Sequence, residues 1–211
     1  MADTKVTGLT ENTTPALTDI IYIVDDPGGS AASQKITLAN LKTIVAGRVL
    51  ISEQSPTGAT VTWDSIPNSY NSLEVELMGR TDKASVANEA INLYFNNDTT
   101  AGNYYSQNLS GTATTASTVA ADNASVITIP AATATANYAG YSLVRIPDYA
   151  DTTFHKIARI LNGRRDDATN GFVSTRVMFW ESTVAITRVD LVTASSGNFI
   201  SGTRARLYGI Y

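Results

Sequence analysis

Few residues in this chain could carry chemistry. Cysteine is absent, and His155 is the single histidine among 211 residues. Disulfide frameworks, thiol nucleophiles, cysteine-ligated zinc or iron–sulfur sites and any site that needs two histidines are therefore excluded. Asp148 and Asp151 are partners for His155 only by proximity in the sequence. We therefore interpret His155 as an ordinary histidine of a predicted strand.

Acidic pairs are the remaining catalytic candidates. Glu74 and Glu76 alternate on one face of a predicted strand with Cα atoms about 6.5–7 Å apart, which is compatible with the acid pair of a glycoside hydrolase. The same alternation makes that face the solvent face, where carboxylates keep a protein soluble. Asp166 and Asp167 lie in a predicted turn. We therefore predict no catalytic residues.

Metal and phosphate sites lack their usual residues. Asp25 and Asp26 are not followed by the alternating carboxylates of a calcium loop. Gly28 and Gly29 precede neither a helix nor a Lys-Ser/Thr pair, unlike a phosphate-binding loop. The sequence predicts no metal, no cofactor and no enzymatic activity.

The charge balance argues against a nucleic-acid partner. Lys and Arg number 15 against 19 Asp and Glu, for a net charge of −4, and nucleic-acid binders usually show a basic excess on one face. The predicted turn 163–167 offsets two arginines with two aspartates. No apolar run approaches the roughly 18 residues of a membrane span, and the N-terminus does not resemble a signal peptide. We expect synthesis and folding in a cytoplasm, without membrane insertion.

Residues 1–47 are predicted to form a small N-terminal arm. Two short strands, 19–25 and 34–37, flank a Pro-Gly turn, and a helix is predicted over 38–45 with Gly47 ending it. A hairpin and one short helix cannot bury a stable core by themselves. The arm is therefore expected to dock on another body through its apolar side chains, namely Ile20, Ile21, Ile23, Ile36, Leu38 and Leu41.

Residues 48–211 show the alternation of β-strands. About eight to ten segments alternate apolar and polar residues between short Gly, Asn, Asp, Ser and Pro turns, which is typical of an antiparallel sandwich or jelly roll. Examples are the stripes at 73–77, 91–95 and 173–179 and the C-terminal segment 204–211. The predicted class is all-β, with the small arm in front.

One tract is almost free of charge. Between Asp98 and Arg145 the only charged residue is Asp122, and residues 109–137 are largely Ala, Thr and Ser. This composition fits a mobile surface loop around one strand at 126–129, and it also fits a contact between subunits. Three tyrosines around the tract, Tyr104, Tyr105 and Tyr138, are candidate receptor or subunit contacts, although tyrosines also fill sandwich cores.

Several motifs resemble those of tailed-bacteriophage structural proteins. The N-terminal segments 1–10, 19–25 and 35–41 are similar to an attachment segment found in proteins described as tail fibres. The later motifs are similar to a phage virion domain: Ile66-Pro67-Asn68-Ser69-Tyr70, Leu93-Tyr94-Phe95-Asn96, Ile146-Pro147-Asp148-Tyr149, Trp180-Glu181-Ser182 and Leu207-Tyr208-Gly209-Ile210.

The resemblance implies a virion surface protein that assembles as a homotrimer. Its other partners would be tail proteins or the major capsid protein, with a host glycan or receptor as a further possibility. The family includes tail fibres, head fibres and capsid decoration proteins, so both a short tail-fibre module and a capsid-stabilising decoration knob remain open. It carries no catalytic set, and none is transferred to this chain.

Overall fold

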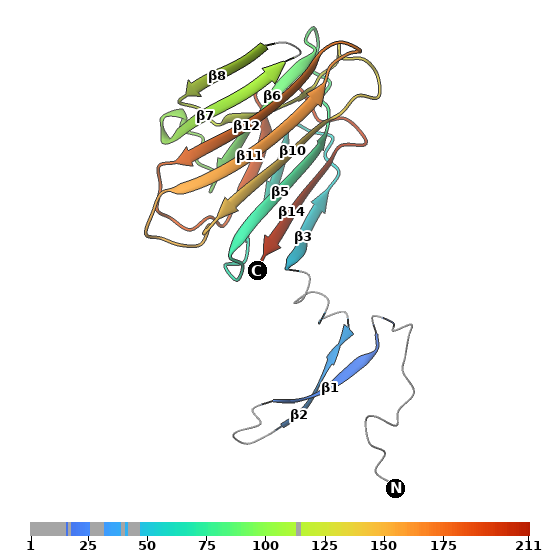
Figure 1. Ribbon diagram of the computed structural model, residues 1–211, viewed down its shortest axis with the longest axis vertical. Helices are drawn as coiled ribbons and strands as arrows, with labels where there is room; N and C mark the ends of the chain where they lie inside the picture. Colours follow the sequence, from blue (N-terminus) through green and yellow to red (C-terminus); the bar gives the residue numbers. More distant parts are fainter. Residues whose placement is uncertain (1–15, 17, 26–31, 39–40, 42–46, 113–114) are drawn as a thin grey trace. The chain divides into compact units, whose positions relative to one another are not determined.

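The computed structural model describes residues 16, 18–25, 32–38, 41, 47–112 and 115–211. Its contacts divide the chain into two compact units, residues 1–47 and 48–211 (Figure 1).

The described part of the first unit is a β-hairpin. Strand β1 (Ile20–Asp25) pairs antiparallel with β2 (Ala32–Thr37) over six residues each. The amide of Leu38 then donates a 2.9 Å hydrogen bond to the carbonyl of Asp19, which closes the open end of the hairpin. The helix predicted over 38–45 is not supported, because most of its span lies outside the described residues.

The second unit consists of two antiparallel sheets, as the alternation predicted. The larger sheet has eight strands in the spatial order β3 (Arg48–Gln54), β14 (Arg204–Ile210), β5 (Ser72–Gly79), β10 (Gly140–Pro147), β11 (Lys156–Arg165), β12 (Gly171–Trp180), β7 (Tyr104–Thr112) and β8 (Thr115–Ala121). The smaller has the order β4 (Thr60–Trp63), β13 (Val189–Thr193), β6 (Asn88–Phe95) and β9 (Ser125–Pro130). A short 3-10 turn, η2 (Ala101–Asn103), precedes β7.

The chain crosses repeatedly from one sheet to the other. Strands β3, β5, β10 and β14 belong to the large sheet, and β4, β6, β9 and β13 belong to the small one. Along the sequence the two sets alternate except at β6 and β9, which follow each other in the small sheet with the hairpin β7–β8 between them. The hairpins β7–β8 and β11–β12 are inserted into this alternating series, and both extend the large sheet on the same side (Figure 1).

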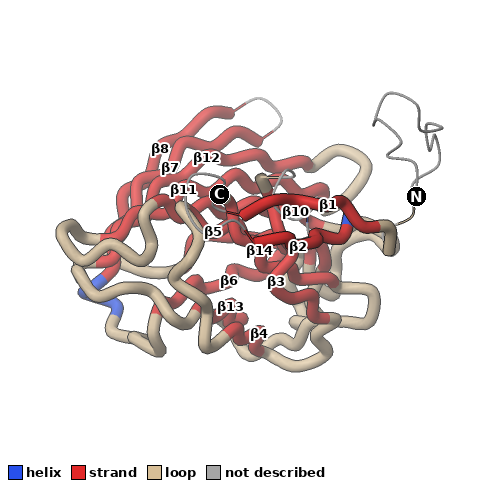
Figure 2. The backbone as a smooth tube through the Cα atoms, turned by 90° about the horizontal axis from the view of Figure 1, so that it is seen from below, coloured by secondary structure: helices blue, strands red, loops and turns tan. Residues whose placement is uncertain are grey.

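One hydrophobic core is shared by both sheets. Alternate residues of β5 in the large sheet and of β6 in the small sheet belong to the same buried cluster, and Leu73, Val75 and Leu77 are fully buried within it. Figure 2 shows β6, β13 and β4 in a layer below β5, β14 and β3, so the unit is sandwich-like.

The charge-free tract is not a long loop. It contains strands β7 and β8, which pair from Ser106 with Ala121 to Thr112 with Thr115, and then β9. Only β9 had a recognisable apolar pattern. The residues of β8 from Thr115 to Ala120 are all exposed, so backbone pairing with β7 specifies that strand and hydrophobic burial does not.

Candidate functional site

The carboxylate pair Glu74 and Glu76 lies on the outer face of the large sheet, as predicted. The Arg48 guanidinium lies 2.5 Å from Glu74 and 2.8 Å from Glu76, and the Tyr141 hydroxyl donates to Glu76 at 3.2 Å. Burial raises the pKa of Glu76, but the hydrogen bond and charge of Arg48 outweigh it, and the net shift is downward. A general acid needs a raised pKa, so the environment of Glu76 does not resemble that of a glycosidase acid.

His155 does not belong to a strand, contrary to the sequence-based interpretation. It is exposed in the segment before β11, which begins at Lys156. Lys156 is the buried residue here: its ammonium group donates to the carbonyls of Phe154 and Thr183, each at 3.2 Å, and to that of Asp151. These backbone acceptors explain why a lysine is tolerated at 3% exposure.

Within the described residues, no three His, Asp or Glu side chains gather closely enough to hold a metal ion. None of the helical segments described has the length and apolar character needed to cross a membrane.

The three candidate tyrosines do not form one site. Tyr104 is 1% exposed, and its hydroxyl donates to the carbonyl of Asp98 at 2.9 Å, so it is a core residue and not a surface contact. Tyr105 is 39% exposed and pairs with Phe179 near one end of β12. Tyr138 is half-buried beneath the Arg165 guanidinium, and Arg165 pairs with the opposite end of β12. Tyr105 and Tyr138 therefore flank different ends of the sheet.

Asp98 organises the end of the sandwich next to Tyr104. Its carboxylate accepts hydrogen bonds from the Trp180 indole and the Asn103 amide, both at 2.8 Å, and from the backbone amide of Thr100 at 3.0 Å. Partial burial raises the pKa of Asp98, but these bonds outweigh it and lower the pKa to about 2. The ionised carboxylate is thus a structural acceptor.

We expect Asp98→Asn to destabilise the protein by about 1 kcal/mol at neutral pH, because an amide cannot accept all three bonds. The folded-state pKa of Asp98 is below its ordinary value of 3.8, so its stabilisation is present above pH 4 and is lost as the pH falls through about 2. Thermal unfolding followed by circular dichroism should show a flatter acid limb for the variant than for the wild type. The exposed Asp122→Asn is the control, and equal acid limbs for wild type and Asp98→Asn would contradict the assignment.

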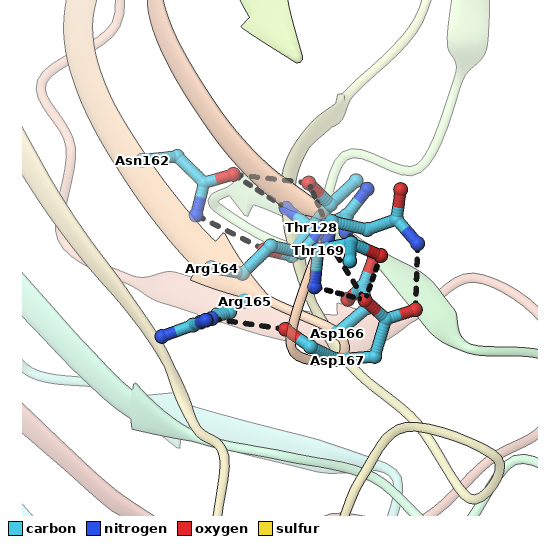
Figure 3. A network of polar contacts seen from close by, with 8 residues as sticks. Thr128, Asn162, Arg164, Arg165, Asp166, Asp167 and Thr169 are labelled. Carbon is cyan, nitrogen blue, oxygen red and sulfur yellow. Dashed lines mark hydrogen bonds and ion pairs between the residues drawn. The ribbon is translucent and has the colours of Figure 1, made fainter. Parts of the chain in front are cut away.

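A polar network connects the two sheets near the β11–β12 turn (Figure 3). The Asn162 amide nitrogen donates to the carbonyl of Thr128 at 3.0 Å, and its oxygen accepts from the backbone amide of Thr128 at 3.2 Å. Arg164 continues the network by bonding to the Thr128 hydroxyl and pairing with Asp166. Thr128 lies on β9, which is the edge strand of the small sheet. The Asn162 side chain therefore pairs with the backbone groups of Thr128 that a further strand would otherwise bind.

In the neighbouring turn, Asp167 accepts hydrogen bonds from the backbone amides of Thr169 and Asn170, both at 2.7 Å. These bonds hold the pKa of Asp167 well below its usual range. Asp167 therefore stabilises the turn as an ionised acceptor.

The most unusual surface is the outer face of strands β10, β11, β12 and β7. Eight outward positions on these strands carry apolar side chains, which define the apolar face: Tyr105, Leu109, Leu143, Ile157, Leu161, Val173, Val177 and Phe179. The predicted stripe at 173–179 belongs to this face, whereas Ser174, Met178 and Trp180 of the same strand are buried.

Two arginines lie within the apolar face. Arg145 and Arg159 are directly opposite each other on β10 and β11, and both are exposed. Neither guanidinium has an ion-pair or hydrogen-bond partner in the part of the chain that the structure describes. A hollow of about 220 Å³ between them is also lined by Leu143, Leu161, Thr175 and Glu74. Like charges directly opposite each other destabilise a sheet, whereas on its other side Arg145 lies opposite Glu74 of β5.

Comparison with known proteins gives no relative: no family model, no curated protein and no solved structure matches this chain. The site must therefore be interpreted from its own residues. A flat, largely aliphatic sheet face is suited to contact with another macromolecule. In the sequence this face was visible as the stripe at 173–179. The alternation alone did not show that the apolar residues of this stripe point away from the core.

Proposed function

We propose that this chain is a non-enzymatic structural protein of a tailed-bacteriophage particle, built as a short tail-fibre-type surface module. The observation that carries the proposal is the strand connectivity. Eight strands are divided equally between the two sheets, in the spatial orders β3-β14-β5-β10 and β4-β13-β6-β9. We infer that this arrangement is a jelly roll, an architecture that recurs in viral capsid and lectin domains. The motifs that resemble phage virion proteins support the same assignment.

The N-terminal unit is the proposed attachment arm. A two-stranded hairpin needs a further packing partner to be stable, and Ile20 and Ile21 are 60% and 37% exposed. Ile36, Leu38 and Leu41 are half-buried, and the side chain of Ile23 lies outside the described residues. Exposed isoleucines on a small hairpin would stabilise it by packing against another particle protein, in the tail or in the capsid.

Attachment can be tested on phage particles assembled without this protein. Purified full-length chain is added back and detected with gold-labelled antibody against residues 48–211. We expect specific labelling with the wild type and only background labelling with a chain that lacks residues 1–47, although its sandwich remains folded. Ile20→Asp combined with Ile21→Asp should behave like the deletion, whereas Thr18→Asp, at an exposed neighbouring position, should attach normally.

Either place of attachment gives the protein a specific role. Gold confined to the tail supports the fibre-type module, and gold spread over the head identifies a capsid decoration protein whose effect on capsid stability is then measured. Normal attachment of the truncated chain would contradict the role of the arm, and the absence of any labelling would overturn the virion assignment.

A further inference from the structure

We propose that the apolar face is the contact surface between copies of this chain, related by a rotation axis parallel to the strands and between β11 and β12. The inference deepens the proposed function, since it assigns the surface that would hold the homotrimer together.

The chemistry of the face favours a protein partner with a similar surface. Leu109, Leu161 and Val173 are 53%, 51% and 57% exposed, and they lie on three adjacent strands. Extended apolar patches on soluble proteins mark interaction sites, and aliphatic sheet faces pack against other sheets.

Two glycines on this face have no explanation within one chain. Gly111 of β7 and Gly163 of β11 occupy outward positions, and a Cβ added to either would meet no atom closer than 3.8 Å. Neither has a positive φ. Glycine weakens a strand, and in a strand interior it often marks a place where another backbone approaches closely. We therefore attribute Gly111 and Gly163 to the close approach of a backbone from another copy of the chain.

The strand register makes the face complementary to itself. Val173 pairs with both Gly111 and Gly163, and Gly163 pairs with Tyr141, so these four residues form one row across the sheet. Rotation about the proposed axis places β11 opposite β12 of another copy and β10 opposite β7. Val173 then lies opposite Gly163 of the other copy, and Tyr141 lies opposite Gly111. Each large side chain in the row faces a glycine.

The adjacent row extends the match. Leu143, Leu161, Thr175 and Leu109 are consecutive partners across β10, β11, β12 and β7. The same rotation brings Leu143 opposite Leu109 and Leu161 opposite Thr175, so this row is mainly aliphatic on both sides.

The rotation also keeps the arginines apart. In the row that contains them, Arg159 pairs with Val177, and Val177 pairs with Gln107. Arg145 therefore lies opposite Gln107 of another copy, whose amide oxygen can accept a hydrogen bond, and Arg159 lies opposite Val177. Direct contact between like charges is avoided.

The area of the face approaches that of a stable interface. Four strands at about 4.8 Å spacing and about 3.3 Å per residue give a flat face of roughly 550 Å², and the relief of the side chains brings it toward the roughly 800 Å² per partner of a stable interface. About a threefold axis at this position, β12 and β7 of each copy lie toward β11 and β10 of the next copy, so the same strands are paired in a trimer, with each face divided between two neighbours.

The test compares variants of the full-length chain by sedimentation equilibrium from about 1 to about 100 µM. Leu161→Glu places a charge in the face, and Gly163→Val fills a glycine position with a side chain that favours strands. We expect the wild type to associate and both variants to associate at least about 100-fold more weakly while circular dichroism shows them folded. The matched controls are Val184→Glu, at a residue 59% exposed outside the face, and Gly58→Val, at a glycine in open space.

Two outcomes would overturn the inference. A wild type that stays monomeric over the whole range excludes self-association, while the gold-labelling experiment still decides attachment to the particle. If Leu161→Glu and Gly163→Val both associate as strongly as the wild type, the copies contact each other through another surface, such as the exposed edge of β8.

Discussion

Asn162→Leu is expected to lower the free energy of unfolding by about 3 kcal/mol. Asn162 is 1% exposed, and its amide also donates to the Ser142 hydroxyl at 2.8 Å and to the Tyr141 carbonyl at 3.2 Å. Leucine has a similar volume but offers neither donors nor an acceptor, so the amide and carbonyl of Thr128 would remain buried without partners. Urea denaturation followed by circular dichroism measures the loss.

Thr128→Val measures the contribution of the Thr128 hydroxyl to stability separately from that of the Thr128 backbone groups. The Thr128 hydroxyl donates to Asn162 at 3.0 Å and accepts from Arg164 at 3.3 Å, whereas its backbone bonds survive the substitution. We expect a cost of about 1 kcal/mol, clearly smaller than for Asn162→Leu. Equal losses for the two variants would mean that the hydroxyl, and not the pairing of the strand edge, dominates the network.

Gly209→Ala is expected to destabilise the sandwich by about 2 kcal/mol, the usual cost of overpacking a filled site. A methyl group at Gly209 on β14 would overlap three atoms of the Tyr70 ring. That ring packs against the core and lies 5.0 Å from the ring of Tyr211, so its displacement disturbs two contacts. The midpoint of thermal unfolding reports the effect.

The same substitution at Gly58, where an added Cβ meets nothing within 4 Å, is the control. It should change the free energy of unfolding by less than about 0.5 kcal/mol. Combining Gly209→Ala with Tyr70→Ala should cost less than the sum of the two single changes, because the overlap disappears with the ring. Strict additivity would show that Tyr70 is not the obstacle.

The sequence predicted the sheets where burial follows a strict alternation. Leu73, Val75 and Leu77 are fully buried, and the β-class assignment follows from such segments. Strand β8 was not predicted, because an edge strand exposed on both faces carries no hydrophobic period. The stripe at 173–179 was visible as a period of two, but the period does not tell whether its apolar residues face the core or the solvent. The residues between them, which include Ser174 and Met178, are the buried ones.

The candidate site was only partly predictable for a similar reason. Polar residues in strands, such as Lys156 and Asn162, are expected at the surface, and both are buried because carbonyl groups from distant segments satisfy them. Tyr104 was a candidate for a receptor or subunit contact, with core packing as the alternative, and it lies in the core, where its hydroxyl has two backbone partners. Gly111 and Gly163 were a further signal for the apolar face besides the stripe at 173–179, because a glycine weakens a strand interior and often marks the close approach of another backbone.

The pairing of Asn162 with the edge of β9 also has a consequence for aggregation. β9 contains Val126-Ile127-Thr128-Ile129, an uncharged β-prone stretch of the kind that templates fibrils when its edge is free. The Asn162 amide blocks the addition of a foreign strand at Thr128, so the small sheet is terminated from within its own fold. Asn162→Leu should therefore increase thioflavin-binding aggregation more than its loss of stability alone explains, with Gly209→Ala as the comparison.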